Sequence, residues 1–437
     1  MTTTTDWIAG PGNALRGDVS VSGDKSVSHR AIMLGAIAEG VTRIEGFLEG
    51  EDTRATAAIF RQLGVRIEAP SAGVRIVHGV GLHGLRASNE PLDCGNAGTA
   101  MRLLTGLLAG QAFDSTLIGD ASLAKRPMRR VIDPLSTMGA RIESDDGRAP
   151  LRIHGGQSLR GANVDLAVAS AQLKSAVLLA GLYADGETRV TEPHPTRDYT
   201  ERMLTAFGVP CECAPGIAAV HGGAALHGTE VHVPADFSSA AFFMVAATLV
   251  PGSELLLRRV GMNSRRTGLL RVLRLMGADI VAEASNVQGG EPVCDLRVRH
   301  APLHGIEVPV EHVPDMIDEF PVLFVAAACA QGVTTVRGAA ELRVKESDRI
   351  AVMVTGLRAL GIRIDETPDG ATIHGGTLRG SAETINSHGD HRIAMAFAVA
   401  AQMADGEVMI GDVANVATSF PGFDTLARGV GFGLRTA

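Results

Sequence analysis

The sequence predicts an α/β (α+β) protein of two domains, in which buried helices are surrounded by sheets. Three observations support this fold class. The chain has 437 residues, which is more than one ordinary core accommodates. A unit of helices and strands recurs six times along it, and the first helix of nearly every copy is apolar on all sides. Helices of that kind belong in a core rather than on a surface.

The first copy of the unit, residues 23–68, shows the order of its elements. A polar turn leads into an Ala-rich helix that stops at a Gly, and the strand 41–47 alternates polar and apolar residues. A second helix, another Gly and the strand 65–68 follow. Gly is favoured just after a helix end, and alternation with a period of two is typical of a half-buried strand.

Five further copies begin at Cys94, Ser170, Asp236, Asp318 and Gly389, and those at Cys94 and Gly389 are looser. Their spacing of roughly 70 residues exceeds the repeat length of solenoids, so each copy is a small folding unit. Six copies over two domains predict three copies per domain. No glycine signature of a dinucleotide or P-loop site follows a strand, which disfavours a nucleotide-binding fold.

Composition excludes several classes of protein. A formal net charge of -8 argues against a general partner for nucleic acid or for an anionic membrane. The five cysteines are irregularly spaced and predict neither a disulfide framework nor a zinc site. The N-terminal residues lack the pattern of a signal peptide, and no apolar run reaches the length of about 20 residues that spans a bilayer. We therefore expect a cytoplasmic protein.

The polar openings of the six first helices are candidate anion sites. They read "GDKSVSHR", "CGNAGTAMR", "SAQLKS", "DFSSA", "DEFP" and "GDHR". Helix N-termini present unpaired N–H groups and a partial positive charge, so several of them facing one cleft would bind a polyanion. The alternative is that these residues are N-caps serving stability alone, which is the interpretation for "DFSSA".

Three clusters of charged residues add to this pattern, in 125–130, 345–349 and 388–392. Lys345 and Arg349 are four residues apart, which would place both on one helical face, where an anionic partner would offset their repulsion. A solvated charged face is the alternative for each cluster. The His-Asp-His run at 388–391 invites a metal interpretation, but no ligand set completes it, so no metal is predicted.

Eight of these motifs occur in one characteristic order: "SGDKSVSHR", "GNAGTAMR", "KRPM", "SAQLKSA", "TRDYT", "MIDEFP", "ELRVKESDR" and "GDHRIAM". With them the chain resembles the 5-enolpyruvylshikimate-3-phosphate synthase family over essentially its full length. "SAQLKSAVLLAG", "MIDEFP" and "SFPGF" resemble its bacterial class II branch.

The resemblance implies a fold of two similar domains, each built from three βαβαββ units. One domain would comprise residues 21–235 and bind shikimate 3-phosphate. The other would comprise residues 1–20 and 236–437 and bind phosphoenolpyruvate. The active site would lie in the cleft between them, which closes on substrate. The family implies no cofactor and no partner other than these small molecules, and we expect a monomer.

The implied reaction transfers the enolpyruvyl group of phosphoenolpyruvate to the 5-hydroxyl of shikimate 3-phosphate and releases phosphate. It proceeds by addition and elimination through a tetrahedral ketal, in the shikimate pathway of aromatic amino-acid biosynthesis. Two anionic substrates side by side require several cations, which accounts for a basic site in an acidic protein.

The resemblance assigns roles residue by residue. Asp318 would be the general base, assisted by Lys25, and Glu346 the proton carrier for the methylene carbon. The residues implied for shikimate 3-phosphate are Lys25, Ser26, Arg30, Ser170, Ala171, Gln172, Arg197, Asp318 and Lys345. Those implied for phosphoenolpyruvate are Lys25, Asn96, Gly98, Arg126, Gln172, Arg349 and Arg392. Ser22, Ser28 and His29 are interpreted as turn, helix-start and packing residues.

The chain also departs from relatives at three places. Ser419 stands where many have a Lys, which removes a cation from the phosphoenolpyruvate side. Glu341 stands where another branch has Asn. Gly98 stands where some class II relatives carry Ala, whose methyl group crowds the herbicide glyphosate. We therefore expect this chain to be more sensitive to glyphosate than those relatives.

Two alternative functions remain to be weighed. The sister enzyme UDP-N-acetylglucosamine enolpyruvyl transferase carries a Cys about where this chain has Asp120, and it lacks the "KESDR" pattern. A non-catalytic or RNA-end-processing protein on a similar repeat fold is disfavoured by Asp318, Glu346 and Lys25 and by the acidic balance.

Overall fold

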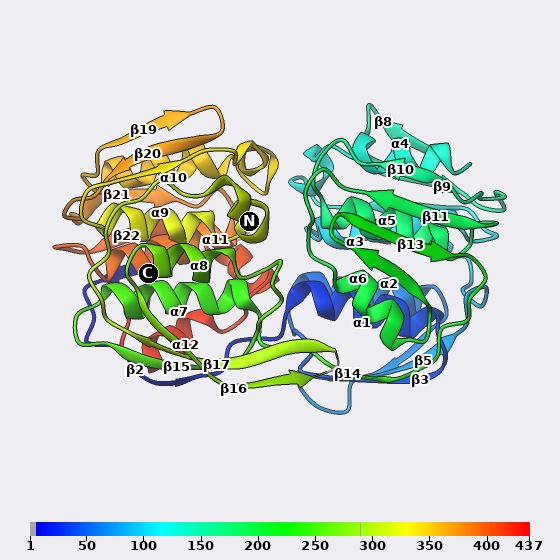
Figure 1. Ribbon diagram of the computed structural model, residues 1–437, viewed down its shortest axis with the longest axis horizontal. Helices are drawn as coiled ribbons and strands as arrows, with labels where there is room; N and C mark the ends of the chain where they lie inside the picture. Colours follow the sequence, from blue (N-terminus) through cyan, green and yellow to red (C-terminus); the bar gives the residue numbers. More distant parts are fainter. Residues whose placement is uncertain (1–5, 289) are drawn as a thin grey trace. The chain divides into compact units, whose positions relative to one another are not determined.

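The computed structural model describes residues 6–288 and 290–437. The chain packs into two compact units, which we describe separately. Unit 1 comprises Met1–Ser22, Pro234–Val287 and Pro292–Ala437, and unit 2 comprises Gly23–Val233 and Gln288–Glu291. The colours of Figure 1 follow the chain through both units.

Unit 2 is built around three central helices, each followed along the chain by a second helix. The central helices are α1 (Lys25–Ile37), α3 (Gly98–Ala109) and α5 (Ala171–Gly181). The second helices are α2 (Glu51–Gln62), α4 (Arg129–Thr137) and α6 (Tyr199–Ala206). Every residue of α5 except Gln172 is buried, as expected for a helix that is apolar on all sides.

Three four-stranded sheets accompany these helices, in the orders β14-β3-β5-β4, β6-β7-β9-β8 and β10-β11-β13-β12. Each has one parallel pair at one edge and two antiparallel pairs after it. Their strands are β3 (Glu39–Glu45), β4 (Arg66–Glu68), β5 (Val74–Val80), β6 (Leu92–Asp93), β7 (Ser115–Ile118), β8 (Arg141–Asp145), β9 (Arg148–His154), β10 (Asn163–Asp165), β11 (Glu187–Thr191), β12 (Cys211–Ala214), β13 (Ile217–His221) and β14 (Glu230–His232).

Unit 1 repeats the plan. Its central helices are α7 (Phe237–Leu249), α9 (Phe320–Cys329) and α11 (His391–Ala401), and its second helices are α8 (Gly268–Leu275), α10 (Arg349–Ala359) and α12 (Phe423–Gly429). Its sheets have the orders β16-β17-β15-β2, β18-β20-β19 and β21-β22-β1-β23. Their strands are β1 (Trp7–Gly10), β2 (Arg16–Val19), β15 (Glu254–Gly261), β16 (Asp279–Gln288), β17 (Glu291–Arg299), β18 (Val333–Val336), β19 (Ile364–Thr367), β20 (Gly370–His374), β21 (Ser381–Asn386), β22 (Val408–Gly411) and β23 (Gly433–Thr436).

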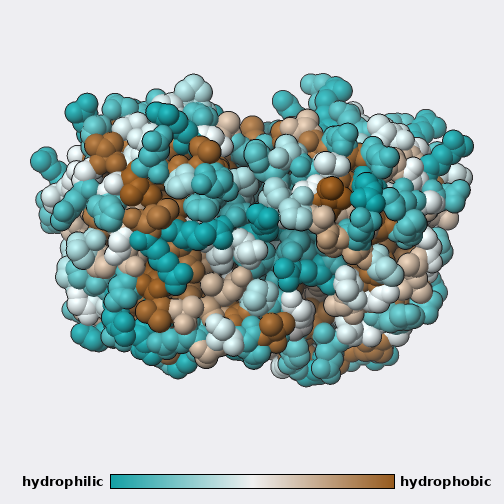
Figure 2. Space-filling model, viewed as in Figure 1, coloured by the Kyte–Doolittle hydropathy of each residue, from teal (hydrophilic) through white to brown (hydrophobic). Residues whose placement is uncertain are grey.

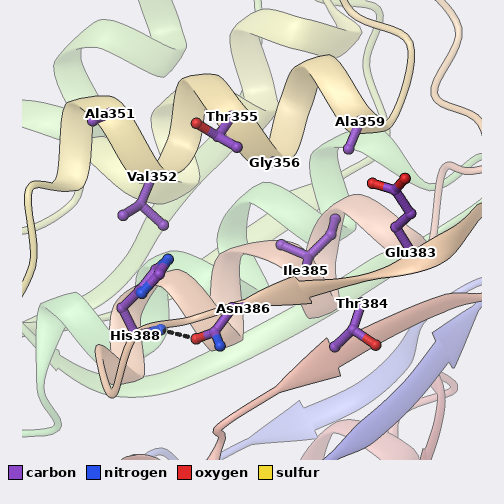
Figure 3. Close-up of a pocket in the computed structure, with 10 residues that line it drawn as sticks. All are labelled: Ala351, Val352, Thr355, Gly356, Ala359, Glu383, Thr384, Ile385, Asn386 and His388. Carbon is purple, nitrogen blue, oxygen red and sulfur yellow. Dashed lines mark hydrogen bonds between the residues drawn. The ribbon is translucent and has the colours of Figure 1, made fainter.

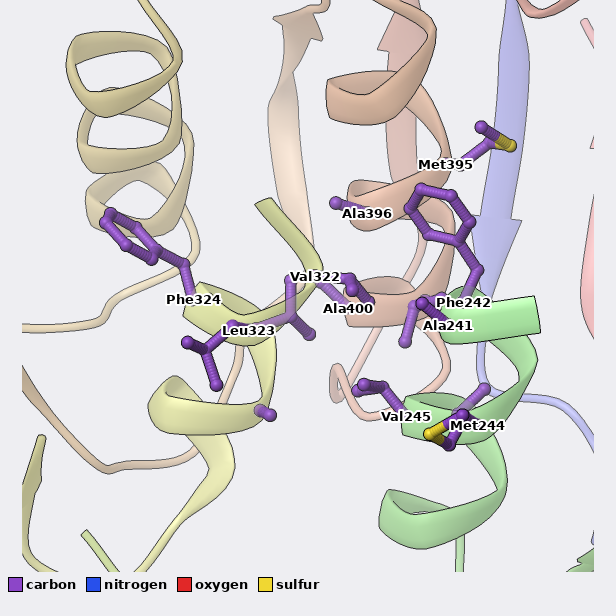
Figure 4. Close-up of a cluster of buried hydrophobic side chains, with 14 of the residues drawn as sticks. Ala241, Phe242, Met244, Val245, Val322, Leu323, Phe324, Met395, Ala396 and Ala400 are labelled. Atoms are coloured by element: carbon purple, nitrogen blue, oxygen red, sulfur yellow. The ribbon is translucent and has the colours of Figure 1, made fainter. Parts of the chain in front are cut away.

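The central helices form the core of each unit. In unit 1 all residues of α7 are buried, and its side chains belong to one core cluster with those of α9 and α11; Figure 4 shows Phe242 of α7 beside Met395 of α11. In unit 2 a Cβ added to Gly106 of α3 would lie 2.0 Å from the carbonyl oxygen of Ala176 on α5, so these two helices pack in close contact. The predicted mixed α/β fold with buried helices is confirmed.

Hydrophilic side chains cover most of the face shown in Figure 2, with apolar ones in small groups among them. None of the helices in the described part of the chain is long and apolar enough to cross a membrane. Within residues 6–288 and 290–437, no group of three or more His, Cys, Asp and Glu side chains is arranged to hold a metal ion.

Candidate functional site

The start of α1 in unit 2 is held by Asp24. One of its carboxylate oxygens accepts a hydrogen bond from the Val27 amide at 2.9 Å, and the other accepts one from the Tyr199 hydroxyl at 3.0 Å. Lys25, the first residue of the helix, forms an ion pair with the buried carboxylate of Asp52. The N-cap therefore also anchors the segment that begins α6.

Arg30 lies one turn further along α1 and is 4% exposed. Its guanidinium donates to the hydroxyls of Thr200 at 2.7 Å and Ser175 at 2.8 Å and to the Ser26 carbonyl at 3.0 Å. No carboxylate in the described residues forms a hydrogen bond or ion pair with it. Burial, followed by the positive charge of Arg197, lowers the pKa of Arg30 to about 10. A buried cation whose direct partners are all neutral favours an anionic ligand.

Arg197 is half-buried in the segment before α6. The residue before it, Thr196, donates its amide and hydroxyl to the buried carboxylate of Glu192. Lys174 of α5 completes this network, with Nζ 2.8 Å from Glu192 and 2.7 Å from Glu201. Burial opposes the charge of Lys174, but the two carboxylates outweigh burial and raise its pKa. This buried ion-pair network therefore fixes the segment that carries Arg197.

A second group of site residues in unit 2 gathers at the start of α3. Asn96 accepts a hydrogen bond from Arg126 at 3.0 Å and donates one to Asp120 at 2.7 Å. Asp120 also accepts hydrogen bonds from the backbone amides of Ser122 and Leu123. Its carboxylate therefore shapes the loop before Arg126.

Gly98 begins α3, and two guanidinium groups lie close to its α-carbon. An added Cβ would lie 2.9 Å from Nη1 of Arg126 and 3.0 Å from Nη1 of Arg102. Arg102 in turn donates to the Gln172 side chain at 2.7 Å, and Gln172 donates to Thr99 at 2.8 Å. The structure thus joins the predicted residues of two helix openings through Arg102, which sequence reasoning did not single out.

Ser170 and Ala171 occupy the start of α5. Ser170 is the N-cap, and its hydroxyl lies 3.5 Å from the Leu173 amide. Ala171 is the buried first residue of the helix. In α1, His29 and Ser28 are wholly buried, with His29 bonded to Thr56 and Ser28 accepting from the Leu48 amide.

In unit 1 the predicted site residues gather around Arg349, which is 2% exposed. Its guanidinium contacts three carboxylates: Asp390 at 2.8 Å, Glu346 at 2.7 Å and Asp318 at 3.5 Å. Burial alone would lower the pKa of Arg349, but the Asp390 and Glu346 carboxylates raise it above its usual value. The proposed base and the proposed proton carrier thus share one guanidinium.

Asp318 precedes α9, and arginines from three segments of unit 1 surround it. Arg266 lies 3.2 Å from its Oδ2 atom, Arg349 faces Oδ1, and Arg392 donates to its backbone carbonyl at 3.1 Å. The next residue, Glu319, is buried, and its Oε1 atom also contacts Arg266 at 3.4 Å. Arg266 and Glu319 were missed by sequence reasoning. The sequence features that could have indicated them are the polar turn "NSRRTG", which contains Arg266, and the motif "MIDEFP", in which Glu319 directly follows Asp318.

Lys345 corrects one expectation. It does not share a helical face with Arg349, because the short helix Ala340–Val344 ends before it and α10 begins only at Arg349. Asp348 ends the irregular stretch by accepting a hydrogen bond from the Ala351 amide, which caps α10. Burial, and then the charge of Arg349, lower the pKa of Lys345, against the opposing effect of Asp318 and Glu346. It remains close enough to these groups for them to interact electrostatically.

Two positions of unit 1 at which the chain differs from relatives, Glu341 and Ser419, lie in or directly after short 3-10 helices. Glu341 is half-buried in Ala340–Val344. Ser419 is 7% exposed and directly follows Ala414–Thr418. Asn415, in that second segment, donates to the Gly389 carbonyl at 2.6 Å, which links it to the loop before α11.

A groove of about 350 Å³ runs between α10 and β21, lined by Val352, Thr355, Glu383 and Asn386 among others. Figure 3 shows His388 at one end of it. It contains none of the predicted site residues. Of the charged cluster 388–392, His388 lines this groove, whereas Asp390 contacts Arg349 and Arg392 contacts Asp318.

The fold and the two clusters point to a class of protein: an α/β enzyme whose buried arginines suit anionic small molecules. A family model described as EPSP synthase (3-phosphoshikimate 1-carboxyvinyltransferase) matches residues 10–426. The chain belongs to this family.

Individual relatives agree. The chain is 68% identical over 435 residues to a 3-phosphoshikimate 1-carboxyvinyltransferase of Xanthomonas euvesicatoria pv. vesicatoria, covering 99% of this chain and 98% of the relative. It is 69% identical over 432 residues to one of Xanthomonas campestris pv. campestris, with the same coverage. A solved EPSP synthase from Acinetobacter baumannii superimposes with a TM-score of 0.89 at 50% identity, over 99% of this chain and 100% of that one. The resemblance drawn from the motifs is confirmed.

Proposed function

We propose that the chain transfers the enolpyruvyl group of phosphoenolpyruvate to the 5-hydroxyl of shikimate 3-phosphate, using the clusters of both units in one reaction. Family membership supports the reaction. The single observation that supports the residue roles is that Arg349 contacts both Asp318 and Glu346, the two carboxylates that the chemistry needs.

In the proposal, shikimate 3-phosphate is held by Arg30 and Arg197, with Lys25, Ser26, Ser170, Ala171, Gln172, Asp318 and Lys345 completing the site. Arg30 supports this role because its positive charge is buried among neutral partners. A phosphate dianion supplies the missing negative charge, and its oxygens accept charge-assisted hydrogen bonds.

Phosphoenolpyruvate is held by Arg126, Arg349 and Arg392, with Lys25, Asn96, Gly98 and Gln172 around it. The planar fork of Arg suits both the carboxylate and the phosphate of this substrate. The Nη1 atom of Arg349 supports its inclusion, because this buried nitrogen makes no hydrogen bond in the described part of the chain and its contact with Asp318 is a long one of 3.5 Å.

The proton transfers follow from the bonds that change. In the addition, the 5-hydroxyl oxygen attacks C2 of phosphoenolpyruvate, Asp318 takes the hydroxyl proton with help from Lys25, and Glu346 gives a proton to the methylene carbon. In the elimination, Glu346 takes a proton back from that carbon, the C2–O bond to phosphate breaks, and the proton on Asp318 leaves with the phosphate. Each general acid or base contributes roughly 10²–10⁴-fold.

A single copy of the chain carries every residue of this proposal, so we also propose that it acts as a monomer. A cytoplasmic location is part of the same proposal, in keeping with the acidic balance and the five irregularly spaced cysteines. Light scattering on the purified chain should give the mass of one copy.

The test is release of phosphate from phosphoenolpyruvate, measured with and without shikimate 3-phosphate. We expect release only with this acceptor, and none with UDP-N-acetylglucosamine. Asp318→Ala and Glu346→Gln should each lower kcat by about 10²–10⁴-fold. The matched control is Glu383→Gln, which removes a carboxylate that lines the groove. Near-normal turnover in both Asp318→Ala and Glu346→Gln would reject the assigned roles.

A further inference from the structure

A buried polar network lies directly behind Asp318 in unit 1. Its centre is Arg266, which is 4% exposed and belongs to the segment between β15 and α8. The turn that carries it is held locally, since the Arg266 amide donates to the Asn263 carbonyl at 2.8 Å. This turn therefore fixes the backbone position of Arg266.

Each end of the Arg266 guanidinium has its own set of partners. Nη1 lies 3.2 Å from Oδ2 of Asp318 and 3.4 Å from Oε1 of Glu319. Nη2 lies 2.5 Å from the Ser238 hydroxyl and 3.4 Å from Oδ1 of Asp236. One planar group thus contacts the proposed base on one side and the start of α7 on the other.

The groups that hold Arg266 are themselves fixed. Ser238 donates its hydroxyl to Glu319 Oε1, and its amide donates to Asp236 at 2.7 Å as the N-cap bond of α7. Glu319 is buried and is the N-cap residue of α9. Burial raises the pKa of the Glu319 carboxyl, which the positive charge of Arg266 opposes. The guanidinium is bracketed by two helix starts that belong to the core.

We infer that Arg266 is a positioning residue for the reaction, holding the Asp318 carboxylate in the orientation in which it takes the proton of the 5-hydroxyl. This inference rests on the proposed role of Asp318. A general base is effective only when its acceptor oxygen is aimed at the proton, and fixing it beforehand removes an entropic cost from the reaction step.

The geometry favours orientation over simple burial. Arg266 contacts Oδ2 of Asp318, Arg349 lies 3.5 Å from its Oδ1, and Arg392 donates a hydrogen bond to its backbone carbonyl. The side chain of Asp318 is still 15% exposed, so a face of it remains accessible.

Several charged groups act on the Asp318 carboxylate and set its pH response. The cations around it are Arg266, Arg349, Arg392 and Lys345, and the acidic groups are Glu319, Glu346, Asp236 and Asp390. Removing one adjacent cation weakens the preference of Asp318 for its charged form. At low pH, kcat/KM falls because the general base becomes protonated. When Arg266 is replaced by a neutral residue, this fall, the acidic limb of the pH profile, should therefore occur at higher pH.

The experiment compares Arg266→Gln and Arg266→Lys with Arg271→Gln. Arg271 is a matched control, because it pairs with Asp315 in the same part of unit 1 without touching Asp318. We expect Arg266→Gln to lower kcat by about ten- to a hundredfold, the effect of one charge-assisted hydrogen bond, with the KM for each substrate changed by less than about threefold. The acidic limb should shift to higher pH. Arg266→Lys should restore the limb and part of kcat, and Arg271→Gln should leave both unchanged.

Folding is checked in parallel by thermal unfolding and by titration with shikimate 3-phosphate. If Arg266→Gln does not fold, Ser238→Ala removes the 2.5 Å contact instead and should lower kcat about threefold to tenfold. A folded Arg266→Gln with kcat within twofold of the original and an unshifted limb would overturn the inference. So would a Ser238→Ala variant with unchanged kcat, in the case where Arg266→Gln cannot be obtained.

Asp318→Asn separates this inference from the function on which it rests. If Asp318→Asn keeps its turnover, the proposed base is wrong. If Asp318→Asn is inactive while the folded Arg266→Gln is normal, only the positioning role is wrong.

Discussion

Arg30 in α1 of unit 2 and Arg349 in α10 of unit 1 are both buried near the start of a helix, but they have opposite kinds of partner. Arg30 in unit 2 bonds to two hydroxyls and a carbonyl, whereas Arg349 in unit 1 contacts three carboxylates. The pKa of Arg30 is lowered to about 10, mainly by burial, and that of Arg349 is raised by Asp390 and Glu346 despite burial. The same side chain therefore has neutral hydrogen-bond partners in one unit, with the charges of Glu201 and Asp24 acting from further away, and is the centre of an ion-pair network in the other.

The difference between the partners of Arg30 and those of Arg349 indicates what each guanidinium can do. A buried guanidinium whose hydrogen-bond partners are neutral has only more distant counter-charges, here Glu201 and Asp24, so it gains from a ligand that brings a negative charge into contact. A guanidinium among carboxylates is already compensated and instead holds those carboxylates in place. Arg30 is thus suited to receive an anionic group, and Arg349 to hold the carboxylates of Asp318 and Glu346 in place.

The largest expected effect is on stability, at Arg349. Arg349→Gln leaves Asp390 buried without its cation, and breaking a buried pair in this way costs about 3–5 kcal/mol. Urea unfolding should show this loss. Arg358→Gln on the same helix is the control, because Arg358 donates to the Ile364 carbonyl and forms no ion pair within the described residues. Equal losses in the two variants would contradict the comparison.

The next effect concerns binding, at Arg30. Arg30→Gln should weaken shikimate 3-phosphate by about 1.5–3 kcal/mol, or roughly 10- to 150-fold, by calorimetric titration. Its stability should change less than that of Arg349→Gln, because no carboxylate loses a direct partner. Arg54→Gln, which removes a mostly exposed cation of α2, should change neither quantity. An unaltered affinity in Arg30→Gln would break the assignment of unit 2 to phosphate.

A smaller effect is expected at Gly98. Gly98→Ala places a methyl group 2.9 Å from Arg126 and 3.0 Å from Arg102, so these guanidinium groups must shift. The cost of such crowding is about 1–3 kcal/mol, which we expect as a rise of roughly tenfold in the KM for phosphoenolpyruvate and a larger rise in the glyphosate concentration needed for inhibition. Gly429→Ala is the control, since an added Cβ there meets nothing within 4 Å. An inhibition constant for glyphosate that does not change would refute the expected crowding.

The smallest effect is a pH dependence at His29, which lies between Lys25 and Arg30. Burial, and then these two positive charges, hold the pKa of His29 well below 6.5. As the pH falls through about 6.5, the unfolded chain binds a proton at this position and the folded chain does not, so stability is lost. The slope reaches at most about 1.4 kcal/mol per pH unit. His29→Gln should remove that part of the slope between pH 7 and pH 5 in urea unfolding. Identical slopes would contradict the lowered pKa of His29 in the folded chain.

Much of the fold could be predicted because it depends on local patterns. Helices that are apolar on all sides cannot face water, so the burial of α7, α9 and α11 followed from their composition. Strand partners could not be predicted in this way. β14 pairs with β3 from the far end of unit 2, and β1 lies between β22 and β23, because register across long separations is set by packing.

The sequence motifs named candidate site residues but not the contacts between them. The motifs identified Lys25, Arg30, Asp318 and Arg349. The motifs did not indicate that Arg266 contacts Asp318, since an Arg in a turn is usually solvated. Lys345 was placed on a helix because spacing alone does not show where a helix begins, and the capping bond of Asp348 decides that.

The sequence by itself determined the class of the fold, the family and the identity of the charged groups, because these depend on composition, repeats and motifs along the chain. Only the tertiary structure decided which charges meet. Apart from the local pair of Arg349 with Glu346, the partners of Arg30 and Arg349 include side chains more than 30 residues away in sequence, namely Ser175, Thr200 and Asp390. Electrostatic energy depends on distance and burial, and both are properties of the folded chain.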